Sequence, residues 1–315
     1  MSFWQNKHVF ITGAGGLVGS HLTRRLVGLG ANVTILLRDE LQGSPLSNII
    51  DSTTRVRGDV RNYGLIQRVV HEYEIEYIFH LAAQAIVGIG AAEPEETIAT
   101  NVMGAVNIMG AARQSKKVRH VVIASSDKAY GELKYGRAYR EDDPLFAINV
   151  YEASKMCADV MAQSYLKEYG QPISIARCGN IYGAGDMNWN RLIPNTIRRL
   201  VNGQAPVIWG TGNETRDFIY VEDVVDGYMA LVERDARGAM NFGTGKATTV
   251  SALIGMICER FGRPALWEMR AKEVGEIDFQ VLDATRAAVE LEWQPRVELD
   301  DGLNKTVEWY KEYFK

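Results

Sequence analysis

Tyr151 and Lys155 form the first pair of residues whose types and spacing could perform proton chemistry. They lie four residues apart in a stretch with helical apolar spacing, so both side chains project from one face of the predicted helix. A tyrosine with a pKa of about 10 is a poor base at neutral pH, and a neighbouring ammonium lowers that pKa because it favours the phenolate. Taken alone, this spacing is typical of core or surface residues, so it indicates catalysis only where other signals converge.

A second polar group follows the apolar run 120–124, which is typical of a buried strand. Ser126, Asp127 and Lys128 come directly after that run. Parallel sheets place ligands at the carboxyl ends of their strands, so these side chains are expected in a cleft. There Ser126 could hydrogen-bond the same substrate oxygen as Tyr151, with Asp127 as an acid and Lys128 as a possible base. These are also ordinary residues of solvated turns, so the case depends on several motifs meeting in one cleft.

A glycine-rich turn supplies the third signal. Gly13, Gly16 and Gly19 follow the apolar run 8–12 and precede a helical pattern. In this context the first glycine permits a tight turn, the second lets the backbone approach a pyrophosphate, and the third lets the helix pack on the strand. The amino end of the helix then faces the anion. The turn therefore predicts a bound dinucleotide.

The end of the second predicted strand, residues 32–37, bears on which dinucleotide is bound. NAD-binding proteins usually place a carboxylate there for the ribose 2′-hydroxyl. Here the strand ends at Leu37, and Arg38 and Asp39 follow. Arg38 could hold the 2′-phosphate of NADP, which favours NADP, whereas Asp39 could reach the ribose of NAD. A mere surface charge at Arg38 is the simpler alternative.

The elements that must position these residues alternate between strands and helices. Apolar runs predict strands at 8–12, 32–37, 54–58, 77–81, 120–124 and 173–177, and helical spacing predicts helices at 20–29, 63–73, 97–115 and 152–169. This alternation predicts an α/β fold with a Rossmann-type, doubly wound parallel sheet.

The second half of the chain is richer in loops, with further helices predicted at 221–234 and 250–261. We therefore expect residues 1–182 to form the dinucleotide-binding part that carries the catalytic residues. Residues 183–315 are expected to form a smaller α/β part that mainly binds substrate, although the chain can cross back between the two.

The composition of the 315 residues limits the classes of partner. The net charge is −4 and the hydrophobic fraction is 46%, so no basic surface points to nucleic acid. Three cysteines without CxxC spacing favour neither a disulfide framework nor a metal site. Neither a signal peptide nor an apolar run long enough to cross a membrane is evident, so we expect a cytoplasmic protein without a membrane partner.

Six motifs in sequence order carry a resemblance that covers nearly the whole chain. They are Thr12–His21, His80–Gln84, Ser126-x-x-x-Tyr130, Tyr151-x-x-x-Lys155, Gly179–Gly183 and Arg216–Asp223. Together they resemble the extended short-chain dehydrogenase/reductase superfamily, specifically its NAD(P)-dependent sugar-nucleotide epimerases and dehydratases.

The resemblance implies a role for each matching position. The pyrophosphate would lie on Gly13, Gly16, Leu17 and Val18, the adenine at Asp59 and Val60, and the cofactor's path to the nicotinamide along Leu81, Ala82 and Ala83. Lys155 would bind the nicotinamide ribose, and Tyr151 would remove the proton of the sugar 4-hydroxyl with help from Ser126. The nucleotide-diphosphate sugar would contact Gln84, Asn180, Leu192, Ile193 and Arg216. Family members often form dimers through two helices per subunit, so the helices at 97–115 and 152–169 are the candidates for a homodimer.

Asp127 and Lys128 favour one reaction within this superfamily. A 4-epimerase needs no acid or base beyond those of the 4-oxidation, whereas a 4,6-dehydratase must also remove the C5 proton and protonate the leaving C6 hydroxyl. The Asp-Lys pair is similar to the CDP-glucose and the UDP-N-acetylglucosamine 4,6-dehydratases. Residues 38–41 look like the latter group and residues 80–84 like the former, while residues 216–220 depart from the CDP-glucose pattern. We therefore expect a 4,6-dehydratase, and the nucleotide and sugar stay open.

Two alternatives accompany this hypothesis. The chain could be a nucleotide-sugar 4-epimerase, which would return hydride to C4 and release no water. It could also be a non-catalytic dinucleotide-binding regulator. The presence of Ser126, Tyr151 and Lys155 argues against the regulator, because a binding module needs no such set.

Overall fold

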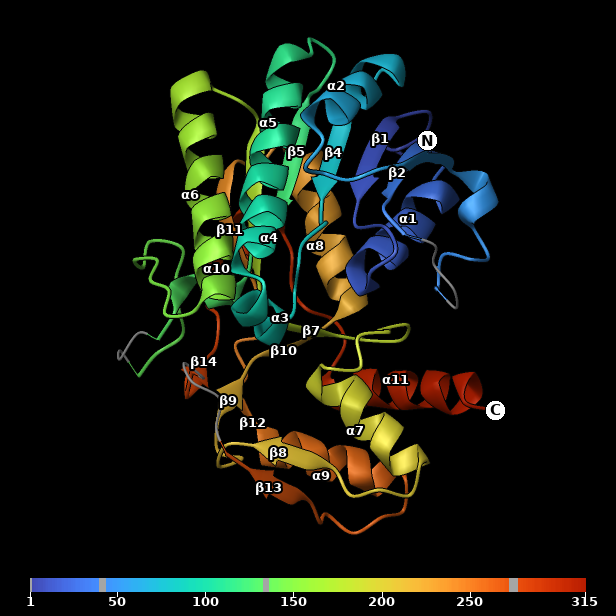
Figure 1. The fold of residues 1–315 in the computed structure, drawn as a ribbon, viewed down its shortest axis with the longest axis vertical. Coiled ribbons are helices and arrows are strands. Elements are labelled where there is room, and N and C mark those ends of the chain that lie inside the picture. The colour runs from blue at the N-terminus through green and yellow to red at the C-terminus, as the bar shows by residue number, and fades with distance from the viewer. Residues whose placement is uncertain (1, 40–43, 133–135, 272–276) are drawn as a thin grey trace.

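The larger part of the molecule is built on one parallel sheet. The computed structural model describes residues 2–39, 44–132, 136–271 and 277–315. Seven strands lie in the order β11-β6-β5-β4-β1-β2-β3, and every neighbouring pair is parallel. Their bounds are β1 (His8–Thr12), β2 (Asn32–Leu37), β3 (Thr54–Arg57), β4 (Tyr77–His80), β5 (His120–Ala124), β6 (Ile173–Cys178) and β11 (Gly238–Phe242). The predicted doubly wound Rossmann-type sheet is confirmed (Figure 1).

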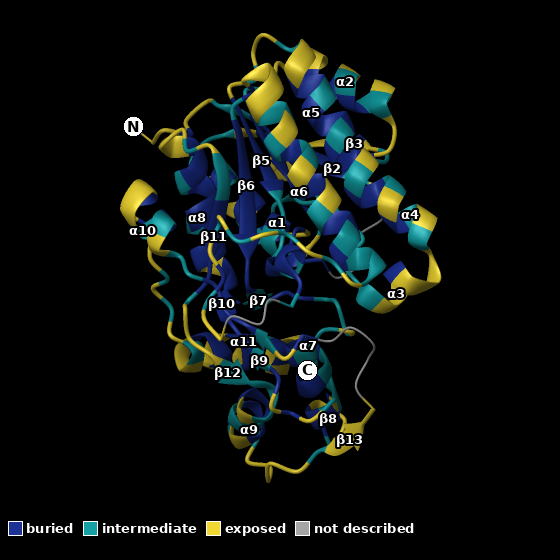
Figure 2. Cartoon of the chain, turned by 90° about the vertical axis from the view of Figure 1, so that its left-hand side faces the viewer, coloured by how far each residue is buried: buried dark blue, intermediate teal, exposed yellow. Residues whose placement is uncertain are grey.

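Helices cover both faces of this sheet, because side chains alternate between the two faces along each strand. Val9 and Ile11 pack in one hydrophobic cluster with α1 (Leu17–Gly28), α8 (Val221–Glu233) and α10 (Thr285–Leu291). Phe10, between them, packs in a second cluster with α2 (Tyr63–Glu72), α5 (Gly104–Gln114) and α6 (Val150–Tyr169). The strands are accordingly buried between two layers of helices, as Figure 2 shows.

The long helix predicted at 97–115 is present in the structure and contains one π-helical turn. Short helices α3 (Val87–Ala92) and α4 (Pro94–Ile98) lead into one π-helical turn, η2 (Ala99–Met103), before α5 begins. Gly104 lies at this junction, where an added Cβ would meet a methyl group of Val60 at 2.9 Å. The π-turn therefore brings the chain close to the loop after β3, an approach that only glycine permits.

A smaller part lies beyond the carboxyl ends of the sheet strands (Figure 1). It contains the strand pairs β10-β7 and β13-β8, the three-stranded group β12-β9-β14, and the helices α7, α9 and α11. Their bounds are β7 (Asn180–Tyr182), α7 (Leu192–Val201), β8 (Val207–Trp209), β9 (Thr215–Arg216), β10 (Phe218–Tyr220), β12 (Thr248–Thr249), α9 (Val250–Arg260), β13 (Glu268–Arg270), β14 (Phe279–Gln280) and α11 (Leu299–Tyr313). Between β10 and β12 the chain returns to the large sheet as α8 and β11.

Two short helices complete the described elements. These are η1 (Ile50–Ser52), which precedes β3, and η3 (Asp127–Tyr130), which follows β5. Across the described ranges, the search for a helix with the length and apolarity to cross a membrane found none.

Candidate active site

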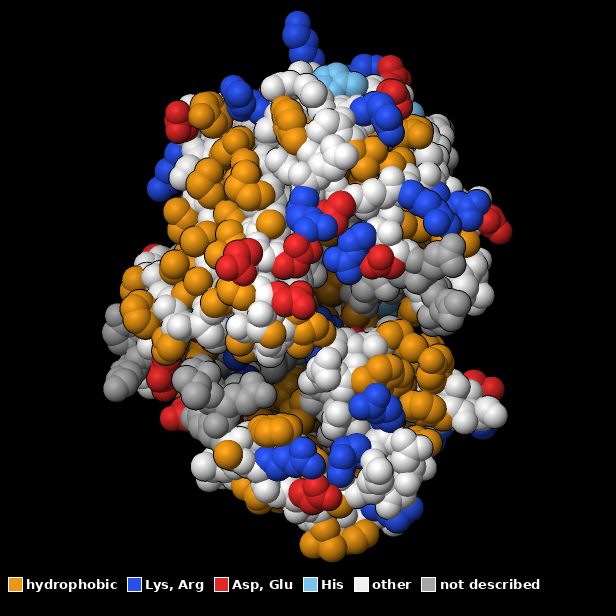
Figure 3. Space-filling model, in the orientation of Figure 1, with side chains coloured by type: hydrophobic (Ala, Val, Ile, Leu, Met, Phe, Trp, Pro, Cys, Tyr) orange, Lys and Arg blue, Asp and Glu red, His pale blue; other side chains and the backbone are white. Residues whose placement is uncertain are grey.

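One cavity runs along the carboxyl edge of the large sheet and faces the smaller part. Its volume is about 730 Å³, and Figure 3 shows the molecular surface hollowed between the two parts. The predicted residues that line it are Gly13, Gly16, Leu17, Val18, Arg38, Asp59, Val60, Leu81, Ala82, Ala83, Ser126, Asp127, Lys128, Tyr151, Lys155, Asn180, Leu192, Ile193 and Arg216. The structure thus brings residues from both halves of the chain to one cavity of ligand size.

Gln84 is the predicted site residue that this cavity lining does not include. Its side chain folds back onto its own loop, where the amide nitrogen donates to the Ile86 carbonyl at 2.9 Å and the amide oxygen accepts from the Ile86 N–H at 2.6 Å. Its backbone N–H donates to Asn101 at 2.7 Å. These bonds shape the loop after β4 rather than present a polar group to a substrate.

The glycine turn has the geometry of a phosphate cradle. Gly13 has φ of +73°, and a Cβ there would lie 2.6 Å from the Ala82 nitrogen. A Cβ at Gly19 would lie 2.2 Å from the Gly13 carbonyl oxygen, so α1 packs directly on the turn. Gly16 is the N-cap of α1 and makes no side-chain capping bond. The first N–H groups of α1 are therefore available to an anion, which fits a dinucleotide pyrophosphate.

Two pairs of charged residues stand at the far end of the cavity, near the carboxyl ends of β2 and β3. The Arg38 guanidinium donates to the Asp39 carboxylate at 2.8 Å, and both side chains are exposed. Asp59 accepts a 2.8 Å bond from Arg61, which lowers the pKa of the Asp59 carboxyl. Glu40 and Leu41, which belong to the stretch that resembles one dehydratase group, lie outside the described residues.

Tyr151 and Lys155 both lie on α6 and line the cavity. The Lys155 ammonium donates to the Ala124 carbonyl at 2.9 Å, and burial lowers the pKa of Lys155 to about 8. Burial raises the pKa of Tyr151 to about 12, while the Arg191 charge and the Ser126 hydroxyl act in the opposite direction. The expectation that Lys155 lowers the tyrosine pKa is not what the structure shows, because loss of water around the phenol outweighs nearby positive charge.

Asp127 is the acid of the segment after β5. Its side chain is 2% exposed, and one carboxyl oxygen accepts a 3.0 Å bond from the Ser126 hydroxyl. The other, Oδ2, has no hydrogen-bond partner among the described residues. Burial raises the pKa of Asp127, with Lys128 and Arg216 opposing the shift. A buried carboxyl with a free oxygen and a raised pKa is suited to hold a proton and deliver it.

Sequence reasoning missed several cavity-lining residues in the loop before α7. Arg191 donates to Asp186 at 3.0 Å, and both line the cavity together with Asn190. Trp209, at the end of β8, lines it as well and is half exposed. A paired arginine and aspartate in a loop rich in glycine and asparagine was the available signal, because such loops seldom bury charge without a reason.

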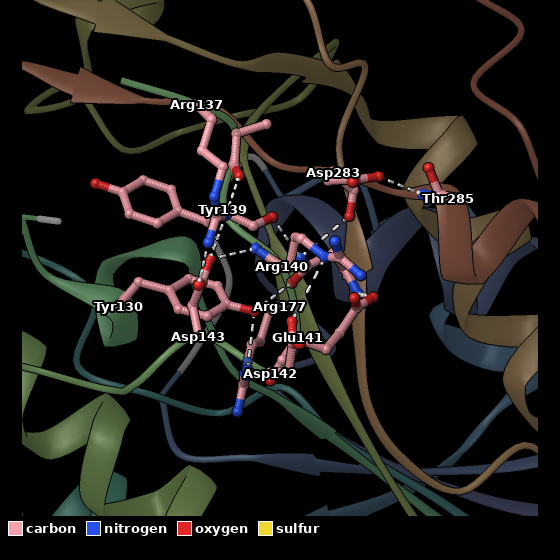
Figure 4. A network of polar contacts seen from close by, with 12 residues as sticks. Tyr130, Arg137, Tyr139, Arg140, Glu141, Asp142, Asp143, Arg177, Asp283 and Thr285 are labelled. Carbon is pink, nitrogen blue, oxygen red and sulfur yellow. Dashed lines mark hydrogen bonds and ion pairs between the residues drawn. The ribbon is translucent and has the colours of Figure 1, made fainter. Parts of the chain in front are cut away.

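A buried polar network lies beneath the catalytic segment. Arg177 on β6 forms an ion pair with Asp159 on α6 at 2.9 Å, and Asp159 accepts a 2.7 Å bond from Ser125. Arg177 also donates to the Tyr130 hydroxyl at 2.8 Å. Figure 4 shows how this network continues to the chain around Tyr139 and Asp283. Both ends of η3 are therefore fixed to the core of the fold.

Comparison with known proteins gives a consistent result. The model of a family described as GDP-mannose 4,6 dehydratase matches residues 10–306. A CDP-glucose 4,6-dehydratase of Salmonella typhimurium is 29% identical, over 100% of this chain and 93% of its own. A dTDP-glucose 4,6-dehydratase of Streptomyces venezuelae, solved with NAD bound, has a TM-score of 0.90 at 28% identity and 97% coverage of both chains.

An epimerase is equally similar in structure. The UDP-glucose 4-epimerase of Thermotoga maritima, solved with UDP-glucose, has a TM-score of 0.92 at 27% identity, covering 98% of this chain and 100% of its own. Similarity alone therefore does not separate dehydration from epimerisation, and the side chains in the cavity must decide.

Proposed function

The chain belongs to the GDP-mannose 4,6 dehydratase family, and on that premise we propose that it is an NAD(P)-dependent nucleotide-sugar 4,6-dehydratase. It converts a nucleoside-diphosphate hexose to the 4-keto-6-deoxy sugar and water. The observation that carries this proposal is the buried carboxyl of Asp127, whose Oδ2 has no partner among the described residues, in a cavity wall that also contains Lys128 and Tyr151. A 4-epimerase has no step that uses such an acid.

The residues divide the proton transfers among them. Tyr151 takes the proton of the sugar 4-hydroxyl, and Ser126 donates a hydrogen bond to that oxygen. NAD(P), which the glycine turn and Lys155 would hold, would supply the hydride acceptor for C4 and the hydride donor for C6. Lys128 takes the C5 proton, and Asp127 gives its proton to the C6 hydroxyl, whose C–O bond breaks to release water. Lys128 then returns a proton to C5. Tyr151 releases the proton that it took and Asp127 regains one from solvent, so both groups return to their starting protonation and the atoms and electrons balance.

The remaining predicted residues bind rather than react. Gly13, Gly16, Leu17 and Val18 hold the pyrophosphate of the cofactor, and Lys155 holds the nicotinamide ribose. Leu81, Ala82 and Ala83 line the path to the nicotinamide, and Asp59 with Val60 lies at the adenine. In residues 183–315, which mainly bind the nucleotide sugar, Leu192, Ile193 and Arg216 contact it together with Asn180. Arg216 does so with charge-assisted hydrogen bonds to the diphosphate.

A substrate panel tests the reaction directly. The purified protein is incubated with nucleoside-diphosphate hexoses of different bases, and the products are analysed by mass spectrometry. Loss of one water from one substrate is expected. A stereoisomer of unchanged mass would instead show a 4-epimerase, and failure of every substrate to reduce the bound cofactor would favour the non-catalytic regulator.

The choice of cofactor is proposed to be NADP over NAD, from Arg38 at the end of β2. Arg38 lines the cavity and its guanidinium can pair with a 2′-phosphate. Asp39 accepts a 2.8 Å bond from that guanidinium. In the NAD alternative, Asp39 would instead accept a hydrogen bond from the ribose 2′-hydroxyl. Mass spectrometry of the nucleotide released by denaturing the purified protein tests the choice, with NADP expected and NAD as the contradicting result.

We further propose that the protein forms a homodimer through α5 and α6 with the turn η2 between α4 and α5. Three apolar side chains lie here and are 46–49% exposed: Ile98 at the end of α4, Met103 on η2 and Val160 on α6. Figure 3 shows hydrophobic side chains gathered over the region where Figure 1 draws α5 and α6. A second copy would remove this surface from water.

A further inference from the structure

Gln280 on β14 is a buried polar residue that the proposed reaction does not use. Its side chain is 0% exposed, and its amide nitrogen donates to the backbone carbonyl of Asp127 at 2.9 Å. Its amide oxygen, like Oδ2 of Asp127, has no partner among the described residues. An unsatisfied buried acceptor destabilises the fold, so burying this amide is unfavourable. We therefore ask what the bond of its nitrogen contributes to the site.

The residue that Gln280 contacts, Asp127, is the proposed acid of the reaction. Asp127 begins η3, a single 3-10 turn, and the Ser126 hydroxyl caps this turn by accepting a 3.2 Å bond from the Lys128 N–H. A turn this short has little stability of its own. The bond from Gln280 on β14 fixes the main chain at the acid.

The segment that carries Gln280 is itself held firmly. Tyr139 donates from its N–H to the Val281 carbonyl at 2.8 Å, and its hydroxyl donates to the Phe279 carbonyl at 3.1 Å. The Asp283 N–H donates to the Tyr139 carbonyl at 2.8 Å, close to the network drawn in Figure 4. Gln280 is therefore a rigid support and not a mobile side chain.

The position of Gln280 also connects the acid with the substrate-binding part. β14 pairs with β9 in parallel, and the register places Gln280 directly beside Arg216. One strand pair thus presents Arg216 to the cavity and holds the chain at Asp127. The same strand pair therefore positions both Arg216, where the diphosphate is proposed to bind, and Asp127, the proposed acid at C6.

We propose that Gln280 is a positioning residue for the dehydration step, which holds Asp127 where it can protonate the C6 hydroxyl of a nucleotide sugar whose diphosphate lies on Arg216. This inference rests on the proposed dehydratase activity. Gln280 affects the breaking of the C6–O bond, where the Asp127 proton is delivered, and leaves the removal of hydride from C4 unchanged. Small displacements of a catalytic group slow its own step strongly.

The test compares the two steps in Gln280→Met, which keeps the length of the side chain and removes the amide. In a single turnover, reduced nicotinamide absorbance reports C4 oxidation, and mass spectrometry reports water loss. We expect elimination to slow roughly tenfold, the effect of one hydrogen bond, with oxidation and KM unchanged. Reduced cofactor then accumulates, which a general loss of structure would not produce.

Gln171→Met is the matched control. Gln171 is also buried, donates its amide nitrogen to a backbone carbonyl, that of Met109 at 3.2 Å, and has an amide oxygen without a partner among the described residues. It is expected to keep the ratio of elimination to oxidation unchanged. Gln280→Glu, which keeps the shape but replaces the donor, is expected to shift the ratio as Gln280→Met does. The ratio is measured within the active molecules, so partial unfolding of a variant does not alter it.

The outcomes separate the inference from the proposed function. If the unsubstituted protein releases no water from any nucleotide-hexose, the dehydratase proposal fails and the inference with it. If it releases water, and both Gln280 variants eliminate and oxidise in the same ratio as the unsubstituted protein, the inference about Gln280 is overturned alone.

Discussion

At the scale of single residues, burial shifts the pKa of the two groups that are proposed to act on the sugar. Asp127 and Tyr151 face the same cavity, and loss of water around each raises its pKa. The shift suits Asp127, because an acid must hold its proton until C6 is in place. It opposes Tyr151, which must lose a proton to act, so the charge of Arg191 and the hydrogen bond with Ser126 matter more for this tyrosine than its spacing from Lys155 suggested.

Asp127→Asn is expected to lose activity and to gain stability. The variant cannot deliver a proton to C6, so water loss should fall by about 10² to 10⁴, while C4 oxidation persists. The variant should be more stable by about 1 kcal/mol near neutral pH, because it no longer ionises a buried carboxyl whose second oxygen lacks a partner among the described residues.

The sign of the pH dependence follows from the raised pKa of Asp127. The folded protein binds a proton that the unfolded chain releases near its ordinary value of 3.8. The unsubstituted protein therefore loses stability as the pH rises from there through the folded pKa, and the variant lacks this loss. Urea unfolding of both proteins at about pH 5 and about pH 8 measures it. A stability difference that stays constant between the two pH values would contradict the prediction.

Tyr151→Phe is expected to lower kcat by about 10³ with little change in substrate affinity, because the base that accepts the 4-hydroxyl proton is lost while the cavity keeps its shape. Steady-state kinetics and calorimetric titration with the nucleotide sugar separate the two quantities. Tyr165→Phe, on the same helix but not among the cavity-lining residues, is the control and should leave both unchanged. Equal losses in the two variants would mean that the effect comes from the helix and not from the phenol.

At the scale of elements, the sequence predicted most of what is local and little of what depends on distant segments. The strands and the glycine turn could be predicted, because the apolar runs of strands and the residue preferences of turns are local properties of the sequence. The π-turn within the helix at 97–115 could not be predicted, since it accompanies close packing of Gly104 against Val60. Gln280 could not be found from sequence either, because its partner Asp127 is 153 positions away.

Gly19→Ala is expected to unfold the cofactor turn. A Cβ at Gly19 would lie 2.2 Å from the Gly13 carbonyl oxygen, which belongs to backbone that cannot give way cheaply. We expect a loss of stability of about 1–3 kcal/mol, the range for overpacking, and weaker retention of the dinucleotide. Chemical unfolding and the quantity of nucleotide released on denaturation measure the two effects.

Gly28→Ala on the same helix is the control for that substitution. A Cβ at Gly28 meets no atom within 4 Å, so alanine should be neutral or stabilise the helix by up to about 1 kcal/mol. Loss of dinucleotide in this variant as well would show that the turn responds to any change in α1, and the steric argument would be wrong.

At the scale of the whole molecule, the fold places its chemistry between two parts with separate cores. The large sheet has a cluster of buried apolar side chains on each face, and the smaller part has its own around α7, α9 and α11. The cavity lies where these parts meet, and its walls come from both. The chain returns to the large sheet as α8 and β11 and again as α10, so several connections join the two parts.

The outer face of α6 belongs to the proposed dimer interface. Val160 lies on that face and is 46% exposed. In a dimer with two-fold symmetry, a substitution there enters the interface twice, so Val160→Asp would bury two carboxylates against apolar surface. Like charges in an interface are unfavourable by several kcal/mol, enough to dissociate a dimer of micromolar affinity. Size-exclusion chromatography with light scattering should show a dimer for the unsubstituted protein and a monomer for the variant.

Val289→Asp is the matched control, because Val289 is 75% exposed on α10, away from the proposed interface, and this variant should remain a dimer. A monomeric unsubstituted protein, or a Val160→Asp variant that stays dimeric, would remove α6 from the interface.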